Sequence, residues 1–476
     1  MSDTREHPET PIESGQQDSD GWIRRHFGQG VWKDRDFVRL WVGQTTSQLG
    51  SQVTLVASPL VAIVYLHVGP SQMGLLGALG RLPFLLYIVA GVFVDRSRRR
   101  PVVIRTDLLR GLLLLTIPLA AAFGVLSFWL LATVTVVVMA LTVWFDIAYM
   151  SYVPGLVQRA NLMQANTIME SSRSGAQVVG PSVGGVLVQV LNAPTALVLD
   201  AASYFASGFA VWRIRAPEVV AAEEPSSAAT GGPADGAAPT PRLGARLRSV
   251  GGSIHEGLAF VGGHRILRPL AVAIGINNLA WAAELTLYVL FMRRGLGLSP
   301  ALIGITLAAT GPGALLGSML AGRTARRFGL SGAIIGGLGL FAGSALLIPF
   351  APHAPAAGVP VLMLAAVGMA AGGQICAVNV LTTRQTITPD RLLGRVNASF
   401  RFVALGVSPL GSLLGGLLGT TLGLRQGLLI AICGMFAAPI IVLLSPVRRV
   451  RTMADASDET PPDTDAAAAR DEASAG

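Results

Sequence analysis

Three charged side chains lie deep inside long apolar segments, where a charge is costly unless it faces a cavity or a partner. They are Arg81, Asp200 and Glu284, and the sequence shows no local partner for any of them. Asp146 lies toward the end of another apolar segment. A buried acid can carry a proton through a membrane protein. We predict that Asp200, Glu284 or Asp146 does so, and that Arg81 contacts an anionic or carbonyl-bearing substrate or pairs with an acid.

Two pairs of opposite charges are spaced three residues apart, Asp107 with Arg110 and Glu170 with Arg173. Residues at this spacing share one face of a helix. We therefore interpret both pairs as structural charge neutralisation rather than as substrate contacts.

Composition points to helices that cross a membrane. Of the 476 residues, 51% are hydrophobic and only 13% are charged, against about 25% charged in a soluble domain. The mean hydropathy is +0.57. A spanning helix takes about 20 apolar residues. Twelve segments meet this length, at residues 38–66, 72–94, 102–124, 126–151, 166–190, 194–213, 268–292, 300–322, 330–350, 358–384, 397–421 and 424–446.

The two groups of six segments are weak copies of each other at an offset of 231 residues. The offset relates pairs in several helices, among them Gly80 with Gly311, Gly91 with Gly322, Arg96 with Arg327, Asn166 with Asn397 and Gly180 with Gly411. Repeated halves with a binding site between them are a transporter architecture. Polar residues follow successive turns of the first segment of each half, including Gln44, Gln48, Asn277 and Asn278. These side chains are candidate substrate contacts, or else hydrogen bonds between helices.

The basic residues between the segments predict the orientation. With the N-terminus inside, most arginines fall on the cytoplasmic side, and the outer side holds little beyond Arg293, Arg294 and Arg425. The positive-inside rule therefore predicts a multi-pass protein of the cell membrane with both termini in the cytoplasm. We expect a disordered or juxtamembrane N-terminus at 1–36, six-helix bundles at 37–215 and 267–446, a cytoplasmic linker with an amphipathic helix at 216–266, and a disordered tail at 447–476.

Several kinds of chemistry are excluded by the residue types. Lys33 is the only lysine, so the chain has no phosphate-binding loop of the GxxxxGK[ST] type. The letters from Gly180 to Gly184 match the G-x-S-x-G motif of hydrolases, but they lie in a continuous apolar segment with no histidine nearby. We expect no enzyme activity, catalytic residue, cofactor or metal, and no nucleic-acid partner, because the basic residues form short clusters between apolar segments.

Two motifs carry a resemblance to a known family. The stretch "GVFVDRSRRR" (91–100) looks like the signature loop of the major facilitator superfamily, and "GRTARRFG" (322–329) looks like its degenerate second copy. The stretch "VVGPSVGGVL" (178–187) resembles the GPxxGG motif of proton-coupled exporters in that superfamily, and residues 144–185 are similar to the macrolide-efflux and enterobactin-exporter-like branch. The motif residues are Gly91, Asp95, Arg96 and Arg99; Gly322, Arg326 and Arg327; and Gly180, Pro181, Gly184 and Gly185.

The resemblance implies an all-α fold of twelve helices in two pseudo-symmetric halves. It implies that Asp95 anchors a cytoplasmic gate, whose second copy differs because Arg326 stands at the matching position. It also implies that GPxxGG is a packing face or hinge, with ordinary small-residue packing as the competing interpretation.

The predicted function is secondary transport by a monomer in the lipid bilayer. We expect proton-coupled efflux of a small, antibiotic-like or drug-like organic molecule by alternating access. A siderophore or metabolite exporter, or an importer, is the alternative within transport. A non-transporting membrane sensor or scaffold is the alternative of another class.

Overall fold

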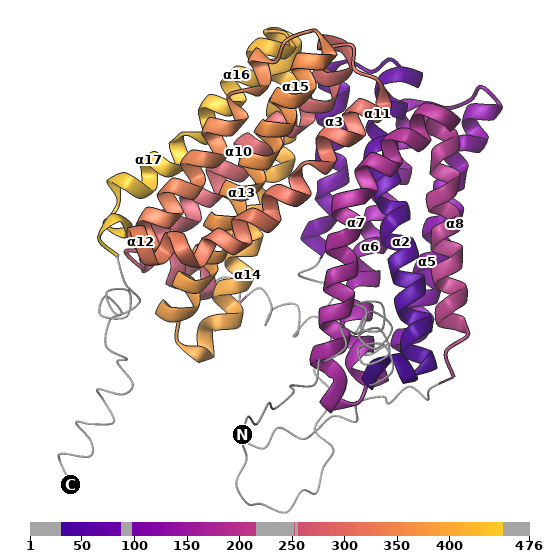
Figure 1. The fold of residues 1–476 in the computed structure, drawn as a ribbon, viewed down its shortest axis with the longest axis horizontal. Coiled ribbons are helices and arrows are strands. Elements are labelled where there is room, and N and C mark those ends of the chain that lie inside the picture. Colours follow the sequence, from indigo (N-terminus) through magenta and orange to yellow (C-terminus); the bar gives the residue numbers. More distant parts are fainter. Residues whose placement is uncertain (1–29, 87–97, 216–251, 253–255, 451–476) are drawn as a thin grey trace, which may run out of the picture.

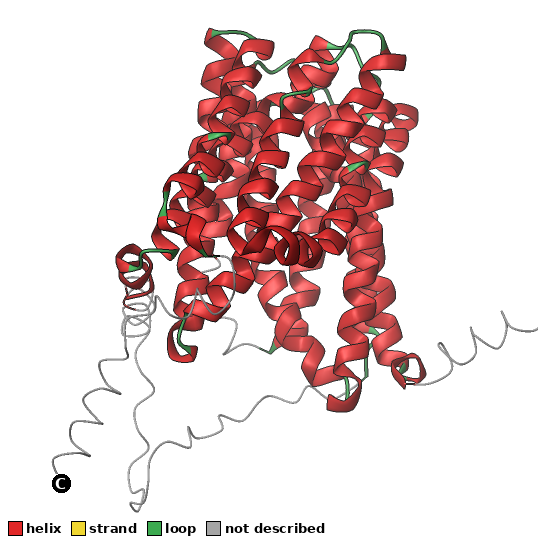
Figure 2. Cartoon of the chain, turned by 60° about the vertical axis from the view of Figure 1, so that its left-hand side comes forward, coloured by secondary structure: helices red, strands yellow, loops and turns green. Residues whose placement is uncertain are grey.

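The computed structural model describes residues 30–86, 98–215, 252 and 256–450, and within these ranges every regular element is a helix (Figures 1 and 2). In the first half the helices are α2 (Arg35–Leu60), α3 (Pro70–Arg81), α5 (Arg99–Ala122), α6 (Phe128–Leu156), α7 (Leu162–Leu191) and α8 (Ala193–Trp212). In the second half they are α10 (Leu267–Leu290), α11 (Pro300–Ala308), α12 (Thr310–Ala345), α13 (Pro355–Ile387), α14 (Asp390–Gly406), α15 (Ser408–Thr421), α16 (Leu424–Met435) and α17 (Ala437–Leu444).

The helices begin where capping side chains satisfy the free N–H groups of the first turn. Asp34 accepts from the backbone of Asp36 and Phe37 before α2, and Ser127 accepts from Leu130 before α6. Inside the helices, apolar side chains face both neighbouring helices and the outside of the molecule, as expected for a protein surrounded by lipid. The prediction of an all-α membrane protein is confirmed.

Nine helical stretches in the described ranges are long and apolar enough to cross a membrane. They contain ten of the twelve predicted segments, because the stretch Pro300–Phe350 holds two, joined at a kink where Gly329 has a φ of 76°. The third predicted segment corresponds to α5, which carries several charged residues. The second corresponds to α3 and the 3₁₀ turn η3 (Leu82–Leu86), and its remainder lies outside the described residues.

The two halves repeat the same unusual backbone features. Each first helix ends in a π-helical turn, η2 (Val61–Tyr65) in one half and η5 (Phe291–Gly295) in the other. A left-handed residue follows each turn, His67 with a φ of 55° and Gly297 with a φ of 68°. These pairs are offset by 230 residues, one fewer than the sequence comparison predicts, because the first segment of each half aligns with a one-residue shift. The prediction of two pseudo-symmetric halves is confirmed.

The halves lie side by side, with the first in indigo to magenta and the second in orange to yellow (Figure 1). Helix α3 of the first half packs on α15 of the second, and α7 packs on α11. On the second half, residues 256–263 form a helical turn against α14, where Glu256 pairs with Arg395. Val261 of this turn joins the core cluster around Leu267 and Val396. This end of the expected amphipathic helix therefore packs on protein; the rest of that helix lies outside the described residues.

Candidate transport site

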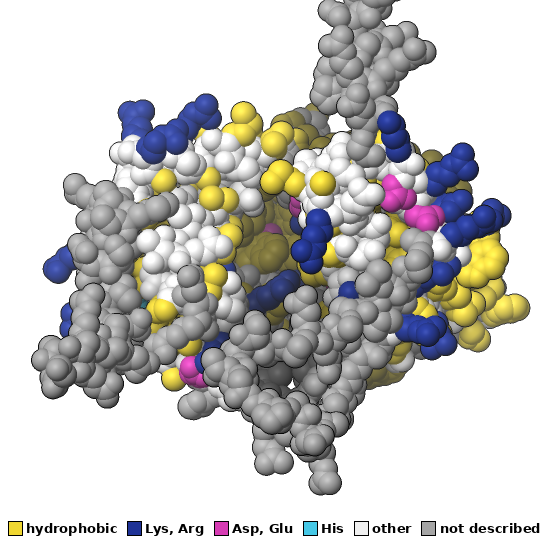
Figure 3. Space-filling view, turned by 90° about the horizontal axis from the view of Figure 1, so that it is seen from below, with side chains coloured by type: hydrophobic (Ala, Val, Ile, Leu, Met, Phe, Trp, Pro, Cys, Tyr) yellow, Lys and Arg dark blue, Asp and Glu magenta, His cyan; other side chains and the backbone are white. Residues whose placement is uncertain are grey.

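A hollow lies between the two halves on the face where α2 begins and α8 ends (Figure 3). Hydrophobic side chains line its depth, and Lys or Arg side chains lie at its edge and within it. A concave site of this kind between the halves of a repeat protein is where a transporter binds its substrate.

One glycine seam closes α3 against α15. A Cβ atom added to Gly74 would lie 2.8 Å from the Cα of Gly416, and one added to Gly416 would lie 3.0 Å from the Cα of Gly74. No real side chain fits in such a contact, so glycine is required at both positions.

A second, equivalent seam closes α7 against α11. A Cβ atom on Gly185 would lie 2.9 Å from the Cα of Gly304, and one on Gly304 would lie 2.8 Å from the Cα of Gly185. Gly185 matches Gly416, and Gly304 matches Gly74, under the offset that relates the halves. The halves are therefore joined by two glycine contacts related by pseudo-symmetry.

The remaining glycines of GPxxGG pack inside the first half. Gly180 contacts the side chain of Gln52, and a Cβ on Gly184 would lie 3.0 Å from the Cα of Val53. The motif thus places α7 against two helices at once: α2 of its own half through Gly180 and Gly184, and α11 of the other half through Gly185. Pro181 is buried between these contacts.

Two further hydrogen bonds cross between the halves close to the seams. Arg294 Nη2 donates to the carbonyl of Ile63 over 3.3 Å, which links the two π-helical turns. The side chain of Gln189, near the end of α7, accepts from the backbone N–H of Ala301 at the start of α11, over 3.2 Å. Both contacts lie at the ends of helices, away from the hollow.

Asp200 lies fully buried between α8 and α2. It accepts hydrogen bonds from the hydroxyls of Thr54 and Ser203, the latter over 3.1 Å. Gly50 on α2 leaves room for this arrangement, because a Cβ there would lie 2.6 Å from Asp200 Oδ1. The sequence identified the acid but not its partners, since Thr54 lies 146 positions away.

Asp107 and Arg110 form an ion pair that is buried inside the first half. The Arg110 guanidinium lies between two aromatic rings, 4.2 Å from the centre of Phe145 and 4.4 Å from the centre of Tyr204. Such cation–π contacts stabilise a guanidinium away from water. Tyr204 in turn shares a hydrogen bond of 3.2 Å with Ser51, so this pair belongs to a network between α2, α5, α6 and α8.

Glu284 on α10 is 1% exposed, and its Oε1 has no hydrogen-bond partner among the described residues. No ion pair within the described ranges includes it. Its surroundings therefore differ from those of Asp200, whose carboxyl is held by two hydroxyls.

The offset places Asp200 and Glu284 at the same level of the two halves. Thr54 matches Glu284, and Asp200 matches Ala431 on α16, which is buried. Neighbouring contacts support this match. A Cβ on Gly50 would lie 2.7 Å from that of Ser203, and the matching Gly434 would place its Cβ 3.6 Å from that of Ala280. Each half thus buries one carboxyl between its first and sixth helices, from the sixth helix in one half and from the first in the other.

Arg81, at the end of α3, bridges the halves. Its Nη1 donates to the hydroxyl of Ser412 on α15 over 2.7 Å and to the carbonyl of Gly77 over 3.1 Å. The sequence could not reveal Ser412 as a partner, because the two residues are 331 positions apart.

The polar residues of the first helices have different surroundings. Gln44 is buried and donates to Ser207 over 3.2 Å, and Asn278 donates to the carbonyl of Ile274 over 2.9 Å within its own helix. Gln48 and Asn277 are half-buried, and the side-chain oxygen of each has no partner in the described ranges. Gln48 and Asn277 are therefore better placed than Gln44 or Asn278 to accept a hydrogen bond from a substrate.

The other predicted charges lie nearer the surface. Glu170 and Arg173 form an exposed ion pair of 2.9 Å, and half-buried Asp146 attracts the same arginine. Of the first gate motif, Gly91, Asp95 and Arg96 lie outside the described residues. Arg99, at the start of α5, donates to the carbonyl of Ser151 over 2.8 Å.

The second gate copy lies on exposed turns of α12. Gly322, Arg326 and Arg327 are exposed, and the Arg327 guanidinium lies 5.6 Å from the Phe328 ring centre. Within the described ranges, no three His, Cys, Asp or Glu side chains gather to hold a metal ion.

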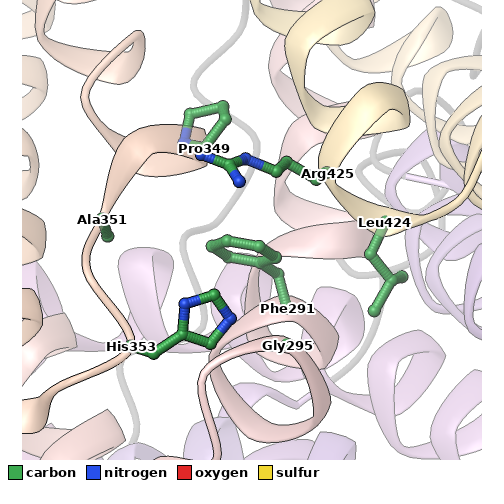
Figure 4. Close-up of a pocket in the computed structure, with 7 residues that line it drawn as sticks. All are labelled: Phe291, Gly295, Pro349, Ala351, His353, Leu424 and Arg425. Atoms are coloured by element: carbon green, nitrogen blue, oxygen red, sulfur yellow. The ribbon is translucent and has the colours of Figure 1, made fainter.

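A small separate pocket lies in the second half, beside η5 and the start of α16, with a volume of about 190 Å³. Figure 4 shows Arg425 reaching over the ring of Phe291, with His353 on the other side. Gly295, Pro349, Ala351 and Leu424 complete its lining. Since all these residues belong to one half, this pocket is distinct from the hollow between the halves.

The chain was compared with known families and proteins. A family profile described as Major Facilitator Superfamily matches residues 40–403 and 270–464. The multidrug efflux pump Tap of Mycobacterium bovis is 27% identical over 421 residues, covering 86% of this chain and 93% of that protein. Tap of Mycolicibacterium fortuitum is 28% identical over 384 residues, covering 78% of this chain and 85% of that protein.

Solved structures share the fold at low identity. A bacterial homologue of the human lysosomal transporter Spinster, in an inward-facing and unoccupied conformation, matches with a TM-score of 0.66 at 15% identity, covering 89% of this chain and 98% of that one. The nucleoside transporter NupG matches with a TM-score of 0.65 at 10% identity, covering 87% and 99%. The profile match extends over most of the chain, and the chain therefore belongs to the major facilitator superfamily of membrane transporters, which are not enzymes.

Proposed function

We propose that this transporter exports a small, drug-like organic molecule in exchange for protons, by alternating access of one central site. The face with the hollow is the cytoplasmic face in this proposal, and both chain termini lie on that side. The six-helix halves act as rigid bodies, joined by a cytoplasmic linker, and one chain is the working unit.

The observation that carries this proposal is the contrast between the two ends of the interface. The Gly74–Gly416 and Gly185–Gly304 contacts hold the halves together, whereas on the opposite face the halves stand apart around the hollow. Rocking about the two seams would expose the central site to one side at a time. Small residues favour such motion, because few side chains must repack when the helices tilt.

Proton coupling is assigned to the buried acids, and first to Glu284. An unpaired carboxylate in an apolar site is strongly destabilising. The site around Glu284 therefore accommodates the neutral acid, and a movement that admits water would let the proton leave. Asp200 is the second candidate, since its two hydroxyl partners can bond either form of the carboxyl.

The substrate class follows from the hollow and from the relatives. Its depth is lined by hydrophobic side chains, while Gln48 and Asn277 offer oxygen acceptors on the first helix of each half. A partly apolar organic molecule with a few polar groups fits such a lining. The curated relatives are multidrug efflux pumps, which agrees with this class.

Transport by the purified full chain in lipid vesicles tests the proposal. An imposed proton gradient should drive uphill movement of dyes and antibiotics, and a protonophore should abolish it. Each substrate should also evoke proton movement in the opposite direction. If no compound of a broad panel, siderophores included, moved with protons, the export proposal would fail and a non-transporting role would stand.

A further inference from the structure

Arg81 continues the line of the α3–α15 seam. Gly74, Gly77 and Arg81 are spaced three and four residues apart, so they share one face of α3. Gly74 touches Gly416 directly, and a Cβ on Gly77 would lie 3.2 Å from the Cβ of Ser412. One turn further on, the long Arg81 side chain fits between the same two helices. The helices therefore diverge along the seam, and Arg81 stands where they begin to separate.

Arg81 also makes the polar bond of this seam. Because the Ser412 hydroxyl donates to the carbonyl of Ser408 over 3.2 Å, its oxygen is free to accept from Arg81 Nη1. The equivalent α7–α11 seam has no such bond. Gly311 stands near the position matching Arg81 and packs against Val178, and Pro181 stands at the position matching Ser412.

The guanidinium keeps further bonding capacity. Of its three nitrogens, Nη1 alone has a hydrogen-bond partner in the described part of the chain. No carboxylate there lies within ion-pair distance of it, and the residue is only half-buried. An unpaired cation at this depth is costly, and an anion that reached it from the hollow would relieve the cost.

We propose that Arg81 is a substrate-binding latch: its bond to Ser412 holds the α3–α15 seam closed, and an anionic group of the substrate, such as a carboxylate, takes the place of Ser412. This inference rests on the proposed export function and adds the class of substrate group that the site recognises.

The exchange of partners links binding to opening. A hydrogen bond between two charged groups is roughly twice as strong as one to a neutral hydroxyl. A carboxylate entering from the hollow would therefore outcompete Ser412 for the guanidinium. The seam would lose its polar bond and keep its glycine contacts, so that bound anion shifts the protein toward the state open on the seam side.

Dye binding to the purified full-length protein tests the binding half. Carboxyfluorescein serves as the anionic probe and rhodamine 123 as the cationic one, each followed by fluorescence anisotropy. We expect Arg81→Gln to raise the Kd of carboxyfluorescein about ten- to a hundredfold and to leave that of rhodamine 123 unchanged. Arg81→Lys should fall between. An unchanged Kd for carboxyfluorescein in Arg81→Gln, or no binding of that dye to the parent protein, overturns the proposal.

The latch half is tested by distances between spin labels at His67 and Gln426, exposed residues of opposite halves beyond the seams. Cys376 and Cys433 are first replaced by serine. Ser412→Ala should increase the population with long distances without ligand, whereas Ser182→Ala on α7 is the matched control and should not. Carboxyfluorescein should have the same effect on the parent protein but not on Arg81→Gln. Identical distributions in parent and Ser412→Ala would refute the latch.

These outcomes separate the latch from the export function itself. Proton-coupled transport of rhodamine 123 by Arg81→Gln would leave the export proposal intact whatever happens to carboxyfluorescein. A protein that moves neither dye with protons would instead contradict the export proposal.

Discussion

Asp200 and Glu284 lie at matching positions of the two halves, but they project from different helices and have different partners. Asp200 comes from α8 and is held by Thr54 and Ser203. Glu284 comes from α10, and its Oε1 lacks a partner in the described residues. The duplicated fold therefore keeps one buried carboxyl in each half while giving the two carboxyls different tasks.

Glu284→Gln should uncouple transport without unfolding the protein. The amide resembles the neutral acid in shape and cannot release a proton, so gradient-driven uphill transport in vesicles should fall at least about tenfold. Exchange of labelled for unlabelled substrate without a gradient should persist, because the halves can still rock.

Asp200→Asn is the matched comparison at the equivalent position. It keeps hydrogen bonding with Thr54 and Ser203, and we expect a smaller loss of gradient-driven transport than in Glu284→Gln. Full coupling in Glu284→Gln together with none in Asp200→Asn would reverse the assignment of the proton to Glu284.

Asp107→Asn should strongly destabilise the first half. It leaves the buried Arg110 guanidinium without its counter-charge, which costs about 3–5 kcal/mol. The melting temperature of the purified protein, followed by intrinsic fluorescence, should drop clearly. Glu170→Gln is the control, because that ion pair is exposed and such pairs contribute only about 0–1 kcal/mol. An equal effect of the two substitutions would show that the buried pair has no special structural weight.

The fold was predictable from the sequence because lipid imposes strong rules on it. Spanning segments need length and apolarity, and repeated halves leave a repeated pattern of glycines. The kink at Gly329 and the short helix α3 illustrate where the rules are weaker. One long helical stretch there contains two predicted segments, and the second predicted segment changes to a 3₁₀ turn at Leu82, beside Pro83.

The candidate site was predictable only residue by residue. A charge in an apolar segment draws attention to Arg81 or Asp200, but the partner of each comes from a distant helix. Ser412 and Thr54 are ordinary hydroxyl residues, and only the fold brings them to the charges. The offset between the halves does carry one usable signal, since Ser412 stands where the other half has Pro181 of GPxxGG.

Gly304→Ala should impair transport by forcing α7 and α11 apart. The new methyl group would meet the Cα of Gly185 at 2.8 Å, closer than a real contact allows. We expect slower transport, and faster labelling of a cysteine placed at Gln189 in a background free of native cysteines. Gly339→Ala on α12 is the control, because a Cβ there meets nothing within 4 Å. Normal transport by Gly304→Ala would mean that the seam can loosen without consequence.

The match between the halves predicts a rescue. Thr54 and Asp200 correspond to Glu284 and Ala431, so the pair Glu284→Thr with Ala431→Asp would rebuild the arrangement of the first half in the second. Glu284→Thr alone should lose gradient-driven transport, because no acid remains between α10 and α16. The double variant should regain a substantial part of it, since the carboxyl returns to the same site from the neighbouring helix. Transport in vesicles under an imposed proton gradient measures both, and Ala431→Asp alone shows whether the added acid is tolerated. If Ala431→Asp folds and transports but the double variant stays uncoupled, proton coupling depends on α10 itself rather than on an acid at this level of the half.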